Sequence, residues 1–358
     1  MRILQVAPPW FTVPPTRYGG VEMVVADLVE GLVAAGHDVT LLASGGSRTS
    51  ARLHTVFDEP PSTALGSTLV ELAHVLALDD LGRFDVVHDH TVLGTARLAL
   101  RADGPVAVHT LHGAWDPVTL AVYDRLGRDV ALVAISHDQA ARAHGVPLAG
   151  VVHNGIDPAR YPVVVDRGDE LVFLGRASPD KGPVEAIEVA RRTGRPLAMA
   201  IKVNERDEHA YWHEAIVPRL GTADVRVVRD ATHEEKVELL AHAHALVAPI
   251  QWDEPFGLVL VEAGACGVPV VAFARGAAPE IVRDGITGAL VDQTDGVDGL
   301  CDAVDAVADV DGAACRRHVA TRFSAARMVA GYLRVYERLA GTRAGLVTSP
   351  PMGQRDPR

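Results

Sequence analysis

The chain has 358 residues and a formal net charge of −12 at pH 7. This length exceeds a typical single hydrophobic core and predicts two domains of roughly 150 residues each. The acidic balance argues against a general nucleic-acid-binding protein, which needs a basic face.

Membrane segments and metal-binding cysteines are also disfavoured. No apolar run approaches the roughly 18 residues that a membrane-spanning helix needs, and Met1–Pro9 is too short for a signal peptide. We therefore expect a cytoplasmic protein without an integral membrane segment. The three cysteines, Cys266, Cys301 and Cys315, are odd in number and lack the spacing of metal ligands. They are expected to be reduced, and zinc is not expected.

Strands and helices alternate along the first half of the chain. Residues 3–7 predict a strand, a Pro-rich loop covers residues 8–15, and apolar residues then recur with helical spacing as far as Gly36. A second strand is predicted at Val39–Ala43. This order implies parallel strands joined by a right-handed crossover. Further strands are expected at 85–88, 106–110, 130–135 and 151–153.

The second half repeats the pattern after turn-forming residues at Asn154–Pro158. Strands are expected at 171–174, 196–201, 225–228, 245–248, 269–273 and 289–291, with helices that include Gly182–Thr193 and 324–339. The sequence thus predicts an α/β protein of two Rossmann-like, doubly wound parallel sheets facing a cleft, where ligands bind at the carboxyl ends of strands. The expected divisions are a first domain at 1–163, a second at 164–323, a helix at 324–340 and a disordered tail at 341–358.

An acid-flanked corner, Glu254 to Glu262, is the most informative stretch. Pro255 and Gly257 break the preceding strand and open a helix that the apolar residues 258–261 continue into the core. A helix N-terminus attracts anions, phosphate above all. Carboxylates instead suit ligands rich in hydroxyl groups, which donate hydrogen bonds to them. The corner therefore predicts binding of a sugar–phosphate compound.

Cations follow another predicted strand of the second half. Arg176 and Lys181 come between the strand at 171–174 and the next helix, where phosphate binds in such folds. A solvated loop is the alternative, which the neighbouring Glu254 corner makes less attractive. Lys202 ends the following strand and is predicted to add a further cation to the cleft.

Gly19 and Gly20 stand directly before the first helix, which allows the backbone to approach a ligand closely. The loop lacks the G-x-G-x-x-G pattern of a dinucleotide-binding dehydrogenase. A plain loop before a helix cap remains the alternative interpretation.

Four histidines, His88, His90, His109 and His112, fall near the ends of neighbouring predicted strands. They lack a carboxylate or cysteine partner at recognisable ligand spacing, so a metal site is not predicted. His112 lies past the end of its strand and is the best placed of them to contact a substrate. A loop histidine with only local hydrogen bonds is the alternative.

Taken together, these motifs resemble the retaining glycosyltransferases of family 4, which have the GT-B fold. The resemblance covers residues 1–340, and the motifs follow the family's order. They are Tyr18-Gly-Gly20, His112-Gly113, Asn154-Gly-Ile-Asp157, Gly175-Arg176 with Lys181-Gly182, and Glu254-Pro-Phe-Gly-Leu with Glu262. The last of these, two glutamates separated by seven residues, is the most specific.

The resemblance implies a donor site for a nucleoside-diphosphate sugar. Arg176 and Lys181 would hold the diphosphate, joined by backbone amides around Phe256, Gly257 and Leu258. Breaking the sugar–phosphate bond leaves negative charge on the phosphate, and these groups would stabilise it as an oxyanion site does.

The remaining residues of the motifs would contact the sugar and ribose. The resemblance implies that Glu254 binds hydroxyls of the transferred sugar, Glu262 the ribose, and His112 the side of the sugar ring, with Gly19 and Gly20 near the diphosphate and acceptor. The predicted catalytic residues are Glu254, His112, Arg176 and Lys181.

The predicted activity is sugar transfer from a nucleotide sugar to a small-molecule, glycan or lipid-linked acceptor, with retention of configuration. No metal and no cofactor are expected, because the cationic loop supplies the positive charge. Two alternatives stay open: a nucleotide-sugar-binding protein without transferase activity, and an epimerase or hydrolase on the same scaffold.

Overall fold

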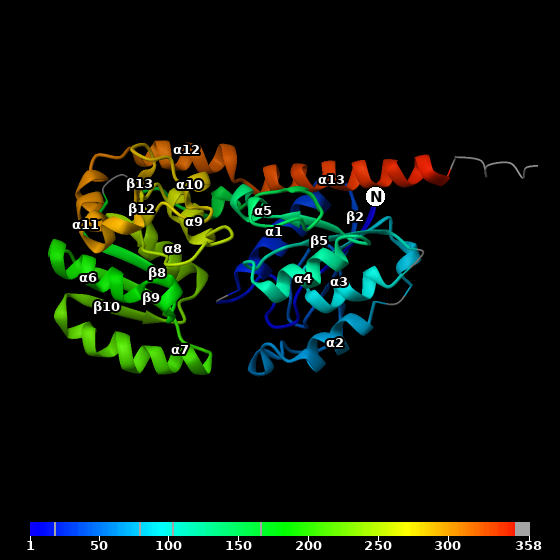
Figure 1. The fold of residues 1–358 in the computed structure, drawn as a ribbon, viewed down its shortest axis with the longest axis horizontal. Coiled ribbons are helices and arrows are strands. Elements are labelled where there is room, and N and C mark those ends of the chain that lie inside the picture. Colours follow the sequence, from blue (N-terminus) through cyan, green and yellow to red (C-terminus); the bar gives the residue numbers. More distant parts are fainter. Residues whose placement is uncertain (18, 79, 102–103, 165–166, 348–358) are drawn as a thin grey trace, which may run out of the picture.

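The computed structural model describes residues 1–358 apart from 18, 79, 102–103, 165–166 and 348–358, and describes only the main chain over 342–347. Tyr18, named in the glycine motif, lies outside the described residues. The chain forms two α/β lobes side by side, the first half in one and most of the second half in the other (Figure 1).

The first domain contains a seven-stranded parallel sheet in the order β3-β2-β1-β4-β5-β6-β7. Its strands are β1 Arg2–Val6, β2 Asp38–Ala43, β3 Arg52–Thr55, β4 Val86–Asp89, β5 Val106–Thr110, β6 Ala131–Ala134 and β7 Leu148–Val151. Its helices are α1 Gly20–Ala34, α2 Thr68–Leu76, α3 Val92–Ala99, α4 Pro117–Leu126 and α5 His137–Ala141. The central strands are buried on both faces, which explains their nearly continuous apolar sequences.

The second domain contains a six-stranded parallel sheet in the order β10-β9-β8-β11-β12-β13. Its strands are β8 Leu171–Arg176, β9 Leu197–Lys202, β10 Val225–Arg229, β11 Ala245–Ala248, β12 Val270–Phe273 and β13 Gly288–Val291. Its helices are α6 Pro183–Thr193, α7 Arg206–Tyr211, α8 His233–Ala241, α9 Leu258–Ala265, α10 Ala278–Ile281, α11 Gly296–Ala306 and α12 Gly312–Arg322. Helices pack on both faces of each sheet, as a doubly wound fold requires.

Short helical turns complete the connections. They are 3₁₀ turns at Ser62–Ala64, Leu81–Arg83, Pro158–Arg160, Pro179–Lys181, Val217–Thr222 and Gln293–Asp295, and a π-helical turn at Trp212–Ile216.

Strand order places the ligand-binding loops. In each sheet the order reverses once, between β1 and β4 in the first and between β8 and β11 in the second. Loops on either side of such a switch point leave in opposite directions and open a crevice at the carboxyl ends of the strands. The loops after β1, β8 and β11 carry the glycine, cationic and acidic motifs predicted from the sequence, so the fold brings these three motifs to crevices.

The last helix, α13 at Ala325–Val347, returns from the second domain to the first and lies along it (Figure 1). Tyr332 and Tyr336 are fully buried there in the core that α1 shares with the sheet. The helix continues past residue 340, so the predicted disordered tail is wrong for 341–347. The rest of that tail, 348–358, lies outside the described residues.

The chain crosses between the domains twice at one place. Ile156 of the first crossing forms a parallel bridge with Ser324 of the second. The amide N–H of Ile156 donates to the carbonyl of Phe323 at 3.0 Å, and that of Ala325 donates to the carbonyl of Ile156 at 2.7 Å. The two crossings are thus hydrogen-bonded to each other.

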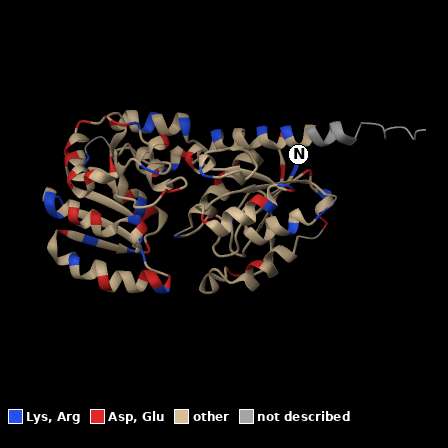
Figure 2. Ribbon diagram, viewed as in Figure 1, with Lys and Arg blue, Asp and Glu red and all other residues tan. Residues whose placement is uncertain are grey.

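One observed strand was not predicted, and one predicted strand is displaced. The sequence missed β3, whose four residues are all exposed at the sheet edge and therefore show no apolar period. The strand predicted at 151–153 is observed as β7, which ends at Val151. Charged residues of both signs are interspersed along the ribbon of both domains (Figure 2). Within the described part of the chain, no helix is both long and apolar enough to cross a membrane.

The contact between α1 and α13 is close enough to test. A Cβ atom on Gly31 of α1 would overlap Cγ2 of Val329 on α13, and a valine is stiff about χ1. Gly31→Ala should therefore lower the free energy of unfolding by about 1–3 kcal/mol through overpacking. Urea unfolding checks this, with Gly82→Ala as the matched control because nothing lies within 4 Å of a Cβ there. Equal stability of both variants would contradict the close contact.

Candidate functional site

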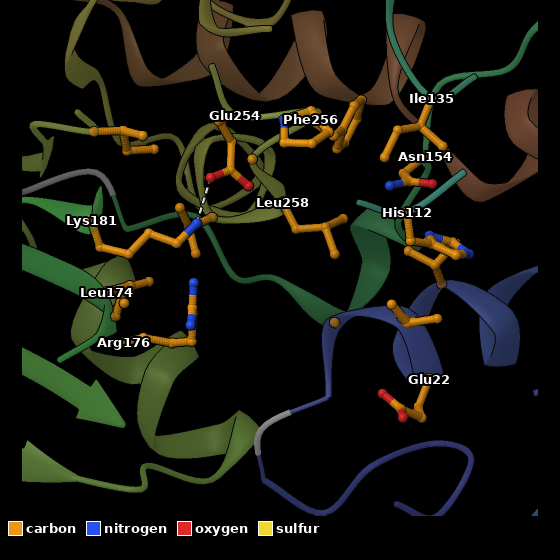
Figure 3. Close-up of a pocket in the computed structure, with 18 of the residues that line it drawn as sticks. Glu22, His112, Ile135, Asn154, Leu174, Arg176, Lys181, Glu254, Phe256 and Leu258 are labelled. Atoms are coloured by element: carbon orange, nitrogen blue, oxygen red, sulfur yellow. Dashed lines mark hydrogen bonds and ion pairs between the residues drawn. The ribbon is translucent and has the colours of Figure 1, made fainter. Parts of the chain in front are cut away.

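A cavity of about 460 Å³ lies between the two switch points and is lined by both domains. Figure 3 shows Glu22 and His112 on the first-domain side, and Arg176, Lys181 and Glu254 on the second. Eight residues predicted from the sequence line this cavity: Gly20, His112, Arg176, Lys181, Glu254, Phe256, Gly257 and Leu258.

The corner before α9 has the expected geometry. Gly257 precedes the helix with φ of +86°, a left-handed conformation that favours glycine. Glu254 forms an ion pair with Lys181 and accepts a hydrogen bond from the indole N–H of Trp252 at 2.7 Å (Figure 3). Lys181 also lies over the Trp252 ring, 5.1 Å from its centroid. One carboxylate is thus held beside one ammonium group at the cavity wall.

Arg176 ends β8 and is balanced by acids of its own domain. Its guanidinium lies 3.1 Å from Asp180 and 3.4 Å from Glu208. Glu208 is buried and also accepts the backbone N–H of Asn204 at 2.8 Å. Arg176 thus lines the cavity while the two acids that pair with it do not, and an anion in the cavity would add a further partner for the guanidinium.

A second, smaller cavity of about 150 Å³ adjoins the first. Gly20, Gly175 and Leu258 line both cavities. The predicted residues Gly19, Lys202 and Glu262 line this second cavity. The predicted donor-binding residues are thus divided between two adjoining cavities.

Glu262 lies one turn into α9 and is almost fully buried. It forms an ion pair with Lys236 and accepts a hydrogen bond from the Tyr161 hydroxyl at 3.3 Å. Lys202 is also buried in this cavity, and burial lowers the pKa of its ammonium group. In strand register Lys202 lies directly opposite Arg176, so two cations stand side by side at the carboxyl edge of the sheet.

The four histidines divide into a structural pair and a pair near the cavity. His88 and His109 are buried and bonded to protein hydroxyls, His88 to Tyr336 at 2.7 Å and His109 to Tyr123 at 3.0 Å. His90 lies behind His112, with the two ring nitrogens 2.9 Å apart. Only His112 of the four lines the first cavity.

Another histidine group joins the domains. His153 lies 2.8 Å from Glu280 of α10, and both oxygens of Glu280 accept backbone N–H groups at the start of α5, from His137 and Asp138. In the described residues, His137, His153 and Glu280 are near enough to one another to share an ion. Their present contacts instead fasten the second domain to the first.

Sequence reasoning assigned no site role to two polar residues that line the cavity, Glu22 and Asn154. Glu22 is buried in the first turn of α1, and its position three residues after Gly19 was the available signal. Burial raises the pKa of its carboxyl to about 7. Asn154 was named in a turn and in the motif Asn154-Gly-Ile-Asp157 but was given no role; it lines the cavity, and its buried Oδ1 has no hydrogen-bond partner among the described residues.

Glu22 generates a pH-dependent prediction. The pKa of this carboxyl is about 7 in the folded protein and 4.5 ordinarily. Its ionisation therefore lowers the free energy of unfolding as the pH rises from 4.5 to 7, and the full penalty is present above pH 7. Glu22→Gln removes this penalty. The unfolding free energy of Glu22→Gln minus that of the wild type should therefore increase by about 3 kcal/mol between pH 4.5 and pH 8. Urea titrations of both proteins at the two pH values measure it, and a pH-independent difference would contradict the assignment.

Comparison with known proteins identifies the family. Residues 18–160 match the family model described as Glycosyltransferase Family 4, and residues 163–316 match Glycosyl transferases group 1. A glycogen synthase of Mycobacterium tuberculosis is 32% identical over 90% of this chain and 89% of that protein. The chain belongs to the family 4 glycosyltransferases.

Other relatives are similar in sequence, and solved structures are similar in fold. A D-inositol 3-phosphate glycosyltransferase of Mycolicibacterium smegmatis is 29% identical over 73% of this chain and 69% of that protein. The crystal structure of AviGT4, a glycosyltransferase involved in avilamycin A biosynthesis, is 30% identical, with a TM-score of 0.74 over 95% of this chain and 98% of that one. A sucrose-phosphate synthase of Thermosynechococcus elongatus, 20% identical, has a TM-score of 0.81 over 96% of this chain and 100% of that one. The GT-B fold predicted from the sequence is confirmed, and the protein is a glycosyltransferase.

Proposed function

We propose that this glycosyltransferase moves a sugar from a nucleoside-diphosphate sugar to a hydroxyl-bearing acceptor, with retention of configuration and without a metal or other cofactor. The observation that carries the proposal is the meeting of cations (Arg176, Lys181 and Lys202), carboxylates (Glu254 and Glu262) and a helix N-terminus in two adjoining cavities. Cations and a helix start suit a diphosphate, and carboxylates suit sugar and ribose hydroxyls.

The two cavities suggest how the donor lies. The ribose binds in the smaller cavity at Glu262, and the transferred sugar binds in the larger one between Glu254 and His112. The diphosphate then spans the shared wall of Gly20, Gly175 and Leu258, between Arg176 and the N-terminus of α9. Glycines at this wall allow the backbone to approach the phosphates. Names of solved structures with this fold support a nucleotide donor: one is a complex with UDP-glucose and another with UDP and glucose.

The chemistry follows from where charge develops. As the bond between sugar and diphosphate breaks, the phosphate gains negative charge and the sugar carbon gains positive charge. Arg176, Lys181 and the backbone amides after Gly257 stabilise the phosphate, while Glu254 holds sugar hydroxyls and keeps Lys181 in place. Retention requires the acceptor to attack from the face that the diphosphate leaves.

The acceptor is proposed only as a class. The names of relatives refer to glycogen, D-inositol 3-phosphate and avilamycin A, which supports different acceptors on one scaffold. Loops of the first domain, including the Pro-rich segment that contributes Pro8, Trp10 and Phe11 to the cavity, are where such differences arise.

The direct test is release of nucleoside diphosphate from a panel of UDP, GDP, TDP and ADP sugars. Arg176→Ala and Lys181→Ala should each lower kcat/KM by about 100- to 1,000-fold, as loss of an oxyanion-stabilising group does. Arg191→Ala, at an exposed arginine of α6, is the matched control and should retain full activity. Unchanged turnover in both cavity variants would overturn the proposed diphosphate site. Release of epimerised sugar nucleotide, or binding without any turnover, would instead support the alternatives.

Glu254 and Glu262 should separate catalysis from nucleotide binding. Glu254→Gln should lower kcat while the Kd for the nucleoside diphosphate stays within about twofold, because this residue contacts the sugar. Glu262→Gln should weaken the Kd about 10- to 100-fold through loss of a charge-assisted hydrogen bond to the ribose. Calorimetry and initial rates measure the two effects, and the reverse pattern would mean that the roles are exchanged.

Metal independence has its own test. With Arg176, Lys181 and the helix start supplying positive charge, initial rates should change by less than about twofold on addition of excess EDTA. Restoration of a lost rate by Mg²⁺ or Mn²⁺ would refute this part of the proposal.

A further inference from the structure

A chain of hydrogen bonds leads from α13 through the first domain to the cavity. The amide Nε2 of Gln5 donates to the Tyr336 hydroxyl at 3.1 Å, and Oε1 of the same side chain lies 3.0 Å from Nε2 of His90. Nδ1 of His90 lies 2.9 Å from Nε2 of His112. Gln5 lies on β1, His90 follows β4 and His112 follows β5, and these strands are neighbours in the sheet.

The direction of this chain follows from the orientation of the Gln5 amide in the structure, with Nε2 toward Tyr336 and Oε1 toward His90. This side chain is fully buried, and its amide can only donate through nitrogen and accept through oxygen. Because Oε1 accepts, the proton of His90 must be on Nε2. Burial lowers the pKa of His90 well below its usual range, so the ring is neutral and its Nδ1 carries a lone pair. His112 must therefore donate to it through Nε2–H.

The same logic leaves one nitrogen of His112 without a proton. Burial and the neighbouring His109 lower the pKa of His112 to about 3, so this ring is also neutral near pH 7. With Nε2 protonated, Nδ1 is a bare acceptor. It has no hydrogen-bond partner among the described residues, and His112 lines the larger cavity.

We propose that Gln5 and His90 are positioning residues that hold His112 as the Nε2–H tautomer, so that its Nδ1 accepts a hydrogen bond from a hydroxyl of the transferred sugar. The identity of this ligand rests on the proposed function, whereas the tautomer is a property of the free protein. A site with a buried acceptor disfavours a sugar that lacks the matching hydroxyl, because the acceptor is then unpaired.

The far end of the chain is anchored on the last helix. The Tyr336 hydroxyl accepts from Gln5 and therefore donates to Nδ1 of His88, 2.7 Å away. His88 Nε2–H in turn donates to Thr110 at 2.7 Å. With these directions, each buried polar group in the chain of hydrogen bonds has a partner, and no two donors or two acceptors face each other.

The first experiment needs no substrate. In the whole chain labelled with ¹⁵N-histidine, long-range ¹H–¹⁵N spectra distinguish protonated from bare ring nitrogens, and His112→Asn assigns the His112 signals by their loss. We expect a protonated Nε2 and a bare Nδ1 at pH 7. A protonated Nδ1 in the wild-type protein, or two tautomers in comparable amounts, would overturn the proposal.

Substitution of Gln5 then tests its part. Gln5→Met removes the amide at similar volume and should give a mixture of tautomers at His112, with kcat/KM lowered about tenfold for one lost hydrogen bond. Gln5→Glu keeps an acceptor toward His90 and should preserve the Nε2–H tautomer. A single unchanged tautomer in Gln5→Met would show that this residue does not position His112. If that variant does not fold, the wild-type spectrum still decides.

The control uses another buried tyrosine of α13. Tyr332→Phe removes a hydroxyl that bonds to Thr110 at 2.7 Å, beyond the His88 end of the chain. It should cost stability without changing the His112 tautomer, and a changed tautomer would mean that general loosening of α13 is responsible. Absence of transfer with the Nε2–H tautomer intact would count against the proposed function alone. Transfer with a protonated Nδ1 would count against this inference alone.

Discussion

Two tyrosines near the end of the chain are fully buried in the domain that the beginning of the chain forms. Tyr332 and Tyr336 pack against α1 and the first sheet, and their hydroxyls satisfy Thr110, Gln5 and His88. Because α13 follows directly from the second domain, this burial joins the two domains at a distance from the cleft. The cleft therefore depends on packing that lies behind it, and the positions of Glu254 and His112 across the cavity follow from it.

Charge balance is the second constraint on the cleft. Three of the cations that line the donor cavities have an acid beside them: Lys181 with Glu254, Arg176 with Asp180, and Lys236 with Glu262. Paired groups hold their side chains in place without leaving a buried charge uncompensated. A diphosphate sugar offers both an anion for the cations and hydroxyls for the acids, so it can replace each internal contact with a matching one.

Much of this arrangement could be predicted from the sequence, because it depends on local signals. Apolar runs marked the buried strands, and Pro255 with Gly257 marked the start of α9. The exposed edge strand β3 gave no such signal. The places of Glu22 and Asn154 in the cavity could not be predicted, because they depend on neighbours that only the tertiary fold brings near. The contact between His88 and Tyr336 joins residues 248 positions apart in the sequence, so no local sequence pattern could predict it. Lys202 was expected in the cleft and lies in the smaller of its two cavities.

The paired crossings at Ile156 and Ser324 also bear on how the enzyme moves. Because both covalent connections between the domains run side by side and are hydrogen-bonded together, they define a single axis. Rotation about such an axis needs dihedral changes in only a few residues and leaves each sheet intact. Points far from the axis would travel furthest in such a rotation, so the outer edges of the cleft would separate most. The reverse rotation would close the cleft and exclude water from it before the sugar is transferred.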